Sequence, residues 1–416
     1  MPNTPSYPGV YIEEIPSGVR TIMGVSTSVA LFIGRTKQGP MKKPTRFLNY
    51  PEFARIFGTD TSLSELPDSV WLFFKNGGTS CYVMRIANGA TAADTSLQLD
   101  AGSGTLDLQT PAGNLAENGE APTLDDYADA YSLIDKEVDL FNLLILPKDG
   151  DHNEATTASL WAPASHFCQR RRGFLLMDAP ANWKSMQAAI SLTTGVNSLR
   201  VGLVKENSAV FYPRLLIDDN GLRKAVGASG AIAGLIARID GTRGVWKAPA
   251  GTEADLRSVA GLEMLFSDQE NGVLNPRGIN TLRAFSTGIV NWGARTMDGD
   301  DQFGSEWKYI PVRRLALFIE ESLYRGTKWV VFEPNDEPLW AQIRLNVGAF
   351  MNNLFRQGAF QGRTPPEAYF VKCDRETTTQ NDINLGVVNI LVGIAPLNPA
   401  EFVVIRLRQK AGQIQF

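Results

Sequence analysis

Two apolar stretches, FNLLILP at residues 141–147 and GFLLMDAP at residues 173–180, decide the fold of the middle of this chain. Both are continuous apolar runs, as expected for strands that are covered on both faces of a sheet. Between them lies ATTASLWAPASHFCQRRR (155–172), an Ala-rich stretch of helical character, and GASGAIAGLIARID (227–240) follows further on. This alternation of strand and helix predicts an α/β unit with a largely parallel sheet over residues 138–297.

The residues before this unit continue the alternation. TSVALFIG (27–34) and CYVMRIA (81–87) are predicted to be buried strands. YPEFARIFG (50–58) and LPDSVWLFFKNGG (66–78) have helical spacing of their apolar residues, and each ends at a glycine. Residues 91–137 begin with a small, polar, turn-rich composition, which predicts a short β or loop insertion.

The last third of the chain mixes helices and strands. VRRLALFIEESLYRG (312–326) places its apolar residues on one helical face, and residues 335–358 read as a long helix with Asn335 or Asp336 as its N-cap. The remaining apolar segments predict strands, namely WVVFEP (329–334), AYFVKCD (368–374), NLGVVNILVGIAP (384–396) and AEFVVIRLRQK (400–410).

Composition excludes several classes of protein. The 416 residues include 40 Lys and Arg against 44 Asp and Glu, so the net charge of −4 gives no electrostatic support for nucleic-acid binding. Cys81, Cys168 and Cys373 are far apart and form no C-x-x-C pair, which argues against disulfides and zinc. The longest apolar stretches are too short to span a bilayer, and the beginning of the sequence has no signal-peptide pattern. We therefore expect a protein that is made in the cytoplasm and takes no cofactor or metal.

The two ends of the sequence read as complementary strands. The N-terminal strand candidate, Val10, Tyr11, Ile12, Glu13, Glu14 and Ile15, is acidic and lies among prolines. The C-terminal candidate is basic and comprises Phe402, Val403, Val404, Ile405, Arg406, Leu407, Arg408 and Lys410. Each strand has two possible partners: the sheet of its own subunit, or a sheet of a neighbouring subunit that it extends.

Several separated motifs, in order, resemble the contractile tail sheath proteins of bacteriophages and related injection particles. The opening SYPGVYIEEIPSGVRTIMGVSTSVALFIGRTKQGP (6–40) resembles the start of that family, as do GGTSCYVMRI (77–86), SGAIAGLIARIDGTRGVWKAPAG (229–251) and GINTLRAFSTGIVNWGARTM (278–297). The match is best from EWKYIPVRRLALFIEESLYRGTKWVVFEPNDEPLW (306–340) through AEFVVIRLRQKAG. Only about residues 90–135 lie outside it.

The resemblance implies a domain plan in which both ends of the chain build an inner domain. Its parts would be an N-terminal arm (1–20), the inner sheath domain (21–90 and 298–400), a short insertion (91–137), an outer, non-catalytic α/β domain of subtilisin-like fold (138–297) and a C-terminal arm (401–416). The overall class is α/β, with a mixed α+β inner domain. The terminal arms would then pair with neighbouring subunits.

The resemblance also implies a function and partners. The subunit would assemble as stacked hexameric rings around an inner tube protein, contact baseplate and tail-terminator or cap proteins, and contract to drive the tube through a target envelope. It would bind no nucleic acid and insert into no membrane. Incorporation into a phage tail or injection particle would follow synthesis in a bacterial cytoplasm. The helix at 335–358 would face the tube, with Arg344, Asn352, Asn353 and Arg356 as polar contacts. A non-contractile tube or shell protein is an alternative.

A hydrolase is the rival function, because subtilisin-like enzymes carry an Asp-His-Ser triad. On paper, Asp149 or Asp151, His152 or His166, and Ser229 have the required order. However, GASGA has alanine where a G-x-S-x-G elbow ends in glycine. We expect His152 to be solvated in a polar turn and His166 to be half-buried, so no catalytic residue is assigned.

Other motifs have simple structural interpretations. The glycines of GASGAIAGLIARID match no phosphate-binding loop and predict close helix packing. MDGDD (297–301) lacks the spacing of a calcium loop. The run Arg170, Arg171 and Arg172 predicts a solvated helix end or a salt bridge to a neighbouring subunit.

Overall fold

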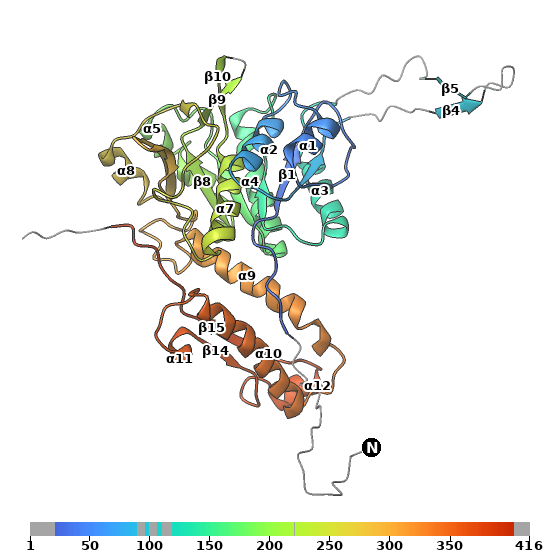
Figure 1. Cartoon of the computed structure of the whole chain (residues 1–416), viewed down its shortest axis with the longest axis vertical. Coiled ribbons are helices and arrows are strands. Elements are labelled where there is room, and N and C mark those ends of the chain that lie inside the picture. The colour runs from blue at the N-terminus through green and yellow to red at the C-terminus, as the bar shows by residue number, and fades with distance from the viewer. Residues whose placement is uncertain (1–20, 90–95, 100–105, 110–118, 220, 403–416) are drawn as a thin grey trace, which may run out of the picture. The chain divides into compact units, whose positions relative to one another are not determined.

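The computed structural model describes residues 21–89, 96–99, 106–109, 119–219 and 221–402, and of 96–99 and 106–109 only the backbone is considered. The chain forms two compact units (Figure 1). The α/β unit contains Ser26–Ile319 and the segment that begins at Leu397, and the small unit contains the residues before Ser26 together with Glu320–Pro396.

An eight-stranded mixed sheet forms the centre of the α/β unit. Its order is β13 (Gly288–Asn291), β12 (Ile279–Phe285), β8 (Ser208–Tyr212), β7 (Phe174–Asp178), β6 (Leu143–Ile145), β1 (Ala30–Gly34), β3 (Cys81–Arg85) and β2 (Thr45–Phe47). The six inner strands are parallel, and the two edge strands, β13 and β2, run antiparallel to their neighbours. Every residue of β1, β6, β7 and β8 is buried, as the continuous apolar sequences of β1, β6 and β7 predict.

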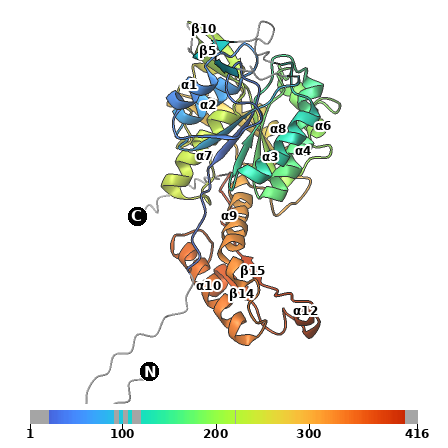
Figure 2. The same ribbon diagram turned by 90° about the vertical axis from the view of Figure 1, so that its right-hand side faces the viewer.

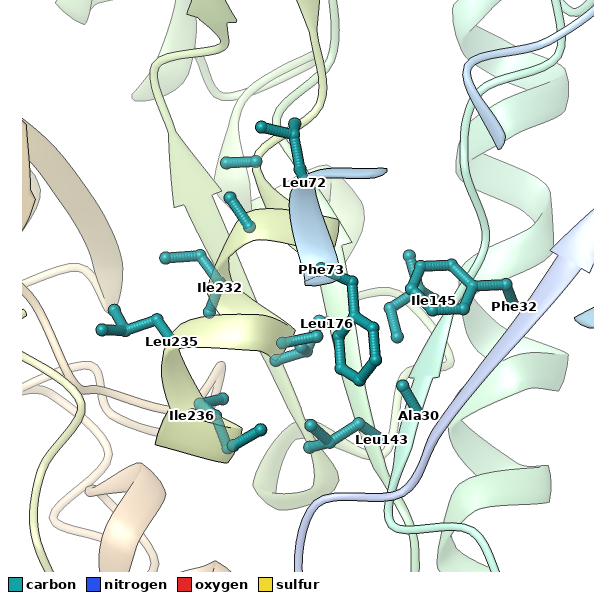
Figure 3. Packing of buried hydrophobic residues seen from close by; sticks show 14 of the residues in the cluster. Ala30, Phe32, Leu72, Phe73, Leu143, Ile145, Leu176, Ile232, Leu235 and Ile236 are labelled. Carbon is teal, nitrogen blue, oxygen red and sulfur yellow. The ribbon is translucent and has the colours of Figure 1, made fainter. Parts of the chain in front are cut away.

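Helices cover both faces of this sheet (Figure 2). Helices α1 (Tyr50–Phe57), α2 (Leu66–Lys75) and α7 (Ser229–Arg243) lie on one face, and α3 (Leu124–Glu137) and α4 (Glu154–Arg171) lie on the other. Alternate residues of β1 supply the two cores: Phe32 packs with Phe73 and Ile232 on the first face (Figure 3), and Leu31 belongs to the core under α3 and α4.

Two glycines allow α7 to pack directly on α2. A Cβ atom at Gly230 would lie 2.3 Å from the carbonyl oxygen of Ser69, and one at Gly234 would lie 2.2 Å from that of Phe73. Only glycine fits so close to a neighbouring backbone. The prediction that the glycines of this stretch serve helix packing is confirmed.

Smaller elements complete the α/β unit. They are the hairpin β4 (Ser96–Leu99) and β5 (Leu106–Gln109), the sheet of β9 (Leu215–Asp219), β10 (Leu222–Val226) and β11 (Gly261–Leu262), the helices α5 (Met186–Ala189), α6 (Val196–Leu199) and α8 (Asp268–Leu274), and the 3₁₀ helix η1 (Lys205–Asn207). Helix α3 also belongs here, so the predicted insertion at 91–137 ends in a helix that packs on the sheet.

The small unit contains the second half of helix α9 (Ile310–Gly326), a long helix α10 (Glu337–Arg356) and a two-stranded antiparallel sheet of β14 (Tyr369–Lys372) and β15 (Leu391–Ile394). The short helices η2 (Lys328–Val330), α11 (Pro365–Ala368) and α12 (Gln380–Asn384) connect them. Asp336, one of the two predicted N-caps, accepts a hydrogen bond from the backbone N–H of Leu339 at 3.3 Å. Asn335 instead donates to the carbonyl of Val387.

One predicted strand is wrong. Residues 329–334 form the end of η2 and a turn, in which the N–H of Val330 donates to Thr327 and that of Glu333 to Val330. No strand in the described part of the chain pairs with the β-branched residues of this segment, and Val331 and Phe332 are exposed. Strand propensity depends on such tertiary packing.

The compact units divide the chain differently from the predicted domains. Strands β1 and β3, from the predicted inner segment 21–90, pair directly with each other and with β6 in the large sheet. Residues 298–319 also belong to the α/β unit. The strand β1 is apolar on both faces, which fits its place inside a doubly covered sheet. The division into an inner and an outer domain of a sheath stays a prediction.

Candidate functional site

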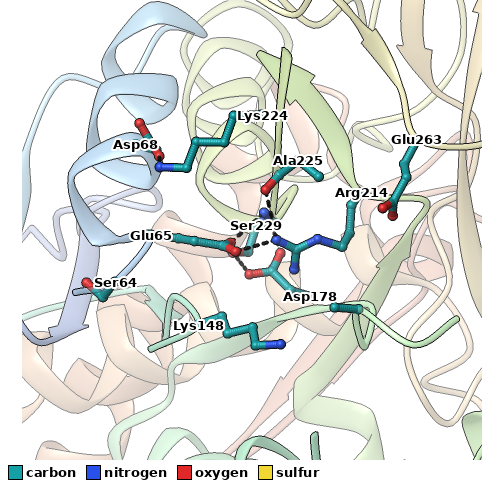
Figure 4. A network of polar contacts seen from close by, with 12 residues as sticks. Ser64, Glu65, Asp68, Lys148, Asp178, Arg214, Lys224, Ala225, Ser229 and Glu263 are labelled. Atoms are coloured by element: carbon teal, nitrogen blue, oxygen red, sulfur yellow. Dashed lines mark hydrogen bonds and ion pairs between the residues drawn. The ribbon is translucent and has the colours of Figure 1, made fainter. Parts of the chain in front are cut away.

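A buried polar network lies at the carboxyl ends of the central strands (Figure 4). Asp178 ends β7, Arg214 follows β8, Glu65 precedes α2 and Ser229 begins α7. The hydroxyl of Ser229 donates to Asp178 Oδ2 at 2.8 Å, and the backbone N–H of Ser229 donates to Oδ1 at 2.7 Å. Arg214 forms an ion pair with Glu65, which also accepts the N–H of Gly227 at 2.9 Å.

This network ties strands to helices, and the partner of the Ser229 hydroxyl is a carboxyl group rather than an imidazole. Burial raises the pKa of Asp178, although the hydrogen bonds from Ser229 oppose that shift. Burial likewise raises the pKa of Glu65 in spite of the adjacent Arg214. The hydroxyl of Ser229 therefore donates to a carboxyl group of high proton affinity, and no imidazole accepts its proton.

The structure does not bring the candidate triad together. His152 is buried, at 8% exposure, and its Nε2 lies 2.9 Å from the carbonyl of Pro122, which corrects the expected solvated position. His166 is exposed on α4 rather than half-buried. Asp149 is held by the buried guanidinium of Arg35 at 2.8 Å. Asp149, His152 and Ser229 each contact a residue outside the proposed triad, so the arrangement supports no acyl-transfer chemistry.

A cavity of about 350 Å³ opens beside the network, but its charges are balanced. Its basic lining residues include Lys148, Lys184 and Lys224. Their ammonium groups pair with Glu154, Glu263 and Asp68, respectively. Within the described ranges no cluster of His, Cys, Asp and Glu has the makings of a metal site.

The charged motifs of the sequence are used within the chain. Arg170 and Arg171 both pair with Asp135 at the end of α3, and the Arg170 side chain remains 61% exposed; a salt bridge to a neighbouring subunit stays a prediction. In the acidic stretch 297–301, Asp300 binds Arg200 at 3.1 Å.

The predicted arm strands lie outside the described residues, except Phe402. These are Val10, Tyr11, Ile12, Glu13, Glu14 and Ile15 at one end and Val403, Val404, Ile405, Arg406, Leu407, Arg408 and Lys410 at the other. Phe402 is 76% exposed. The preceding residue, Glu401, is bound by Arg295, a contact that sequence patterns did not reveal because the two residues are 106 positions apart.

The β14–β15 sheet of the small unit is incomplete. None of its eight residues is buried, and its apolar residues Phe370 and Leu391 are each 52% exposed. Among the described residues no further strand pairs with either outer edge. The sheet packs on α10 through β14, where the hydroxyl of Tyr369 donates to the carbonyl of Gly348 at 3.5 Å, and its open edges suit the addition of further strands.

The four predicted tube contacts on α10 differ in accessibility. Arg344 is engaged within the small unit, where it pairs with Glu337 at 2.6 Å and donates to the carbonyl of Cys373. Asn352 is half-buried, whereas Asn353 and Arg356 are exposed near the end of the helix. Within the described part of the chain, no helix is both long and apolar enough to cross a membrane.

Comparison with known proteins assigns this architecture. Residues 120–297 match the family model of the phage tail sheath protein central domain, and residues 303–410 match that of the phage tail sheath C-terminal domain. A curated relative is the tail sheath protein of Vibrio phage KVP40, which is 27% identical over 172 residues. That alignment covers 39% of this chain and a quarter (25%) of the relative's length.

Solved sheath structures match along nearly the whole chain. The sheath complex of the PVC extracellular contractile injection system in its contracted state is 26% identical, with a TM-score of 0.73 over 98% of this chain and 99% of that one. The helical sheath of the anti-feeding prophage in its contracted state is 29% identical, with a TM-score of 0.71 over 98% and 100%. The sheath tail protein from Listeria innocua, at 11% identity and a TM-score of 0.58 over 91% and 96%, shares the fold. The chain therefore belongs to the tail sheath protein family of phages and contractile injection systems.

Proposed function

We propose that this chain is the subunit of a contractile tail sheath, which assembles as stacked hexameric rings around an inner tube and contracts to drive the tube through a target cell envelope. The observation that carries this proposal is the likeness, over 98% of the chain, to two sheaths solved in the contracted state. The stroke needs no cofactor, because a metastable lattice of subunit contacts stores the energy that contraction releases.

The incomplete β14–β15 sheet is the proposed acceptor of the terminal arms of neighbouring subunits. Its edges offer unpaired backbone groups, and each backbone hydrogen bond that an added strand forms contributes about 1 kcal/mol. Glu13 and Glu14 point to opposite faces of their strand, so one of them would lie on the face that Arg406 and Arg408 share on an adjacent added strand, where opposite charges contribute about 0.2–1 kcal/mol per pair. These strands would keep neighbouring subunits linked while the other surfaces repack.

The same proposal assigns the contact with the tube, the outer domain and the partners at the two ends of the sheath. The exposed end of α10, with Asn353 and Arg356, would contact the inner tube, with Asn352 at the border of that contact. The segment 138–297 would be the outer domain of subtilisin-like fold. Baseplate and tail-terminator or cap proteins would hold the two ends of the sheath, which would be made in a bacterial cytoplasm and act in a phage tail or injection particle.

Electron microscopy of the full-length protein tests assembly. Wild-type protein, co-expressed with its tube protein, should form hollow helical sheaths, and a variant lacking residues 1–20 should form none. A contractile sheath should also show two helical lattices, one extended and one contracted. A single lattice under all conditions would instead identify a non-contractile tube, and stable monomers in the presence of the tube protein would contradict the proposal.

Charge reversal tests the pairing of the arms. The double variant E13K/E14K and the double variant R406E/R408E should each reduce the yield of assembled sheath, because like charges then face each other across adjacent strands. Combining all four substitutions should restore the yield. If the quadruple variant assembles no better than either double variant, the two arms do not pair with each other.

A further inference from the structure

The guanidinium of Arg295 binds Glu401, which directly precedes the predicted C-terminal arm strand. Its Nε donates to Glu401 Oε1 at 2.8 Å, and its Nη2 donates to Oε2 at 2.5 Å. Two parallel charged hydrogen bonds fix both the position and the orientation of the carboxylate. The Arg295 side chain is completely buried, whereas that of Glu401 is 16% exposed.

Arg295 is itself fixed to the large sheet. Its backbone N–H donates to Asn280 Oδ1 at 2.7 Å, and Asn280 Nδ2 returns a hydrogen bond of 2.7 Å to the carbonyl of Arg295. Asn280 lies on β12, one of the inner parallel strands, and is completely buried. The remaining guanidinium nitrogen, Nη1, donates to Asp301 at 2.8 Å and to the carbonyl of Gly299 at 3.1 Å. Arg295 therefore connects Glu401 to the core of the α/β unit through Asn280.

The change in environment at this point is abrupt. Glu401 is bound by a buried side chain, and the next residue, Phe402, is 76% exposed. The segment before Glu401 includes Pro396 and Pro399, which restrict its backbone. Glu401, which is bound by Arg295 and lies between these prolines and the exposed Phe402, is therefore placed to fix the start of the arm on the α/β unit.

The N-terminal segment has a comparable contact. Arg314, on α9, donates to the carbonyl of Thr27 at 2.8 Å and forms an ion pair with Asp240 of α7 at 2.6 Å. The side chains of Arg314 and Asp240 are almost fully buried. A buried arginine therefore binds the chain near each end of the α/β unit: Arg314 binds Thr27, and Arg295 binds Glu401.

We propose that Glu401 is a positioning residue that anchors the root of the C-terminal arm to the α/β unit through Arg295, so that the arm begins at residue 402. The significance of the anchor rests on the proposed function, because it matters for assembly only if the arm joins subunits. A fixed root sets the reach of the arm and transmits force from a neighbouring subunit into the sheet rather than into a loose connection.

A spin label at position 402 measures the anchor in the isolated full-length subunit. The F402C substitution provides one exposed thiol, whereas the three native cysteines are completely buried. In this background, E401Q removes the charge of the anchored group with little change in shape. D301N is the matched control, because it removes the other carboxylate on the same guanidinium without touching the arm.

We expect the label to be largely immobile in the F402C parent and in D301N, and mobile in E401Q. The released fraction should rise by about ten- to a hundredfold, as the loss of a charged hydrogen-bonded pair implies. Thermal unfolding of each variant shows separately whether the α/β unit remains folded. Equal mobility in E401Q and the parent, or greater mobility in D301N than in E401Q, would overturn the anchor.

Assembly with the tube protein then tests what the anchor does. E401Q should yield fewer sheaths than D301N, because its arm leaves the subunit in many directions. If E401Q frees the label but assembles as well as D301N, the anchor has no role in presenting the arm. If even the unsubstituted protein forms no sheath, the proposed function fails, while the mobility measurement still decides whether Glu401 is anchored.

Discussion

The contact between α2 and α7 offers a quantitative test of the packing. Replacing Gly234 by alanine would place a Cβ atom 2.2 Å from the carbonyl oxygen of Phe73 and 2.8 Å from the Cβ of Asn76. Ordinary contact begins near 3.4 Å, so the helices would have to separate by about 1 Å. Neither neighbour is the flexible end of a side chain, and the strain spreads through the core that both helices share with the sheet.

A second glycine on the same helix provides the control. Gly241 has open space where a Cβ would be added. Both G234A and G241A gain about 1 kcal/mol in helix propensity, so this gain cancels when the two variants are compared. The difference between them is then the cost of overpacking, which is typically about 1–3 kcal/mol. G241A should be more stable than the wild type, and G234A less stable than G241A by this amount.

Thermal unfolding of both variants measures the difference. For a unit of this size, 1 kcal/mol corresponds to roughly 2–4 °C in Tm, so the two transitions should be separated by at least about 2 °C. The G230A variant, whose Cβ would lie 2.3 Å from the carbonyl of Ser69, should behave like G234A. Equal Tm values for G234A and G241A would refute the argument that these glycines are required by helix contact.

Three further predictions concern buried polar groups. D240N should lower the free energy of unfolding by about 3–5 kcal/mol in denaturant titrations, because it leaves the buried Arg314 without its anionic partner; a loss below 1 kcal/mol would show that the pair is hydrated. S229A should lower the free energy of unfolding by about 1–3 kcal/mol, because it removes the hydroxyl donor to the buried Asp178. A serine-reactive probe should not label the wild-type protein. Labelling that S229A abolishes would instead support the hydrolase function. The three cysteines should not react with a thiol reagent at pH 8 until denaturant is added, because burial raises the pKa of all three thiols, that of Cys373 to about 11; reaction of the native protein would contradict their burial.

The strands of the large sheet could be predicted because their consecutive apolar residues indicate burial on both faces. A run such as FLLM (174–177), apolar at consecutive positions, is stable only where both faces of the sheet are covered. Helices α1, α2, α9 and α10 were likewise marked by apolar periodicity and by their caps. What this pattern leaves open is the choice of partners, so the pairing of β1 with β3 and β6 was not foreseen.

The errors arose where tertiary contacts override local pattern. The segment 329–334 has strand-forming residues, but none of the strands that the structure describes pairs with it. His152 lies in a polar turn by sequence, yet the carbonyl of Pro122 comes over it and buries it. The pairs Arg214–Glu65 and Arg295–Glu401 join residues 149 and 106 positions apart, a relation that no single-sequence pattern contains. Asp178, which ends an apolar run, was the one visible signal of the buried network.

The two sheets differ in whether their strands find all their neighbours within one subunit. In the large sheet the inner strands have all their neighbours, so the α/β unit is complete as a single subunit. The β14–β15 sheet has no buried residue, and among the described residues its outer edges have room for further strands. If neighbouring arms supply them, the same hydrogen bonds complete the fold of one subunit and join it to the next. Such links need not break during contraction, because repacking can take place between the complete α/β units while the added strands stay paired.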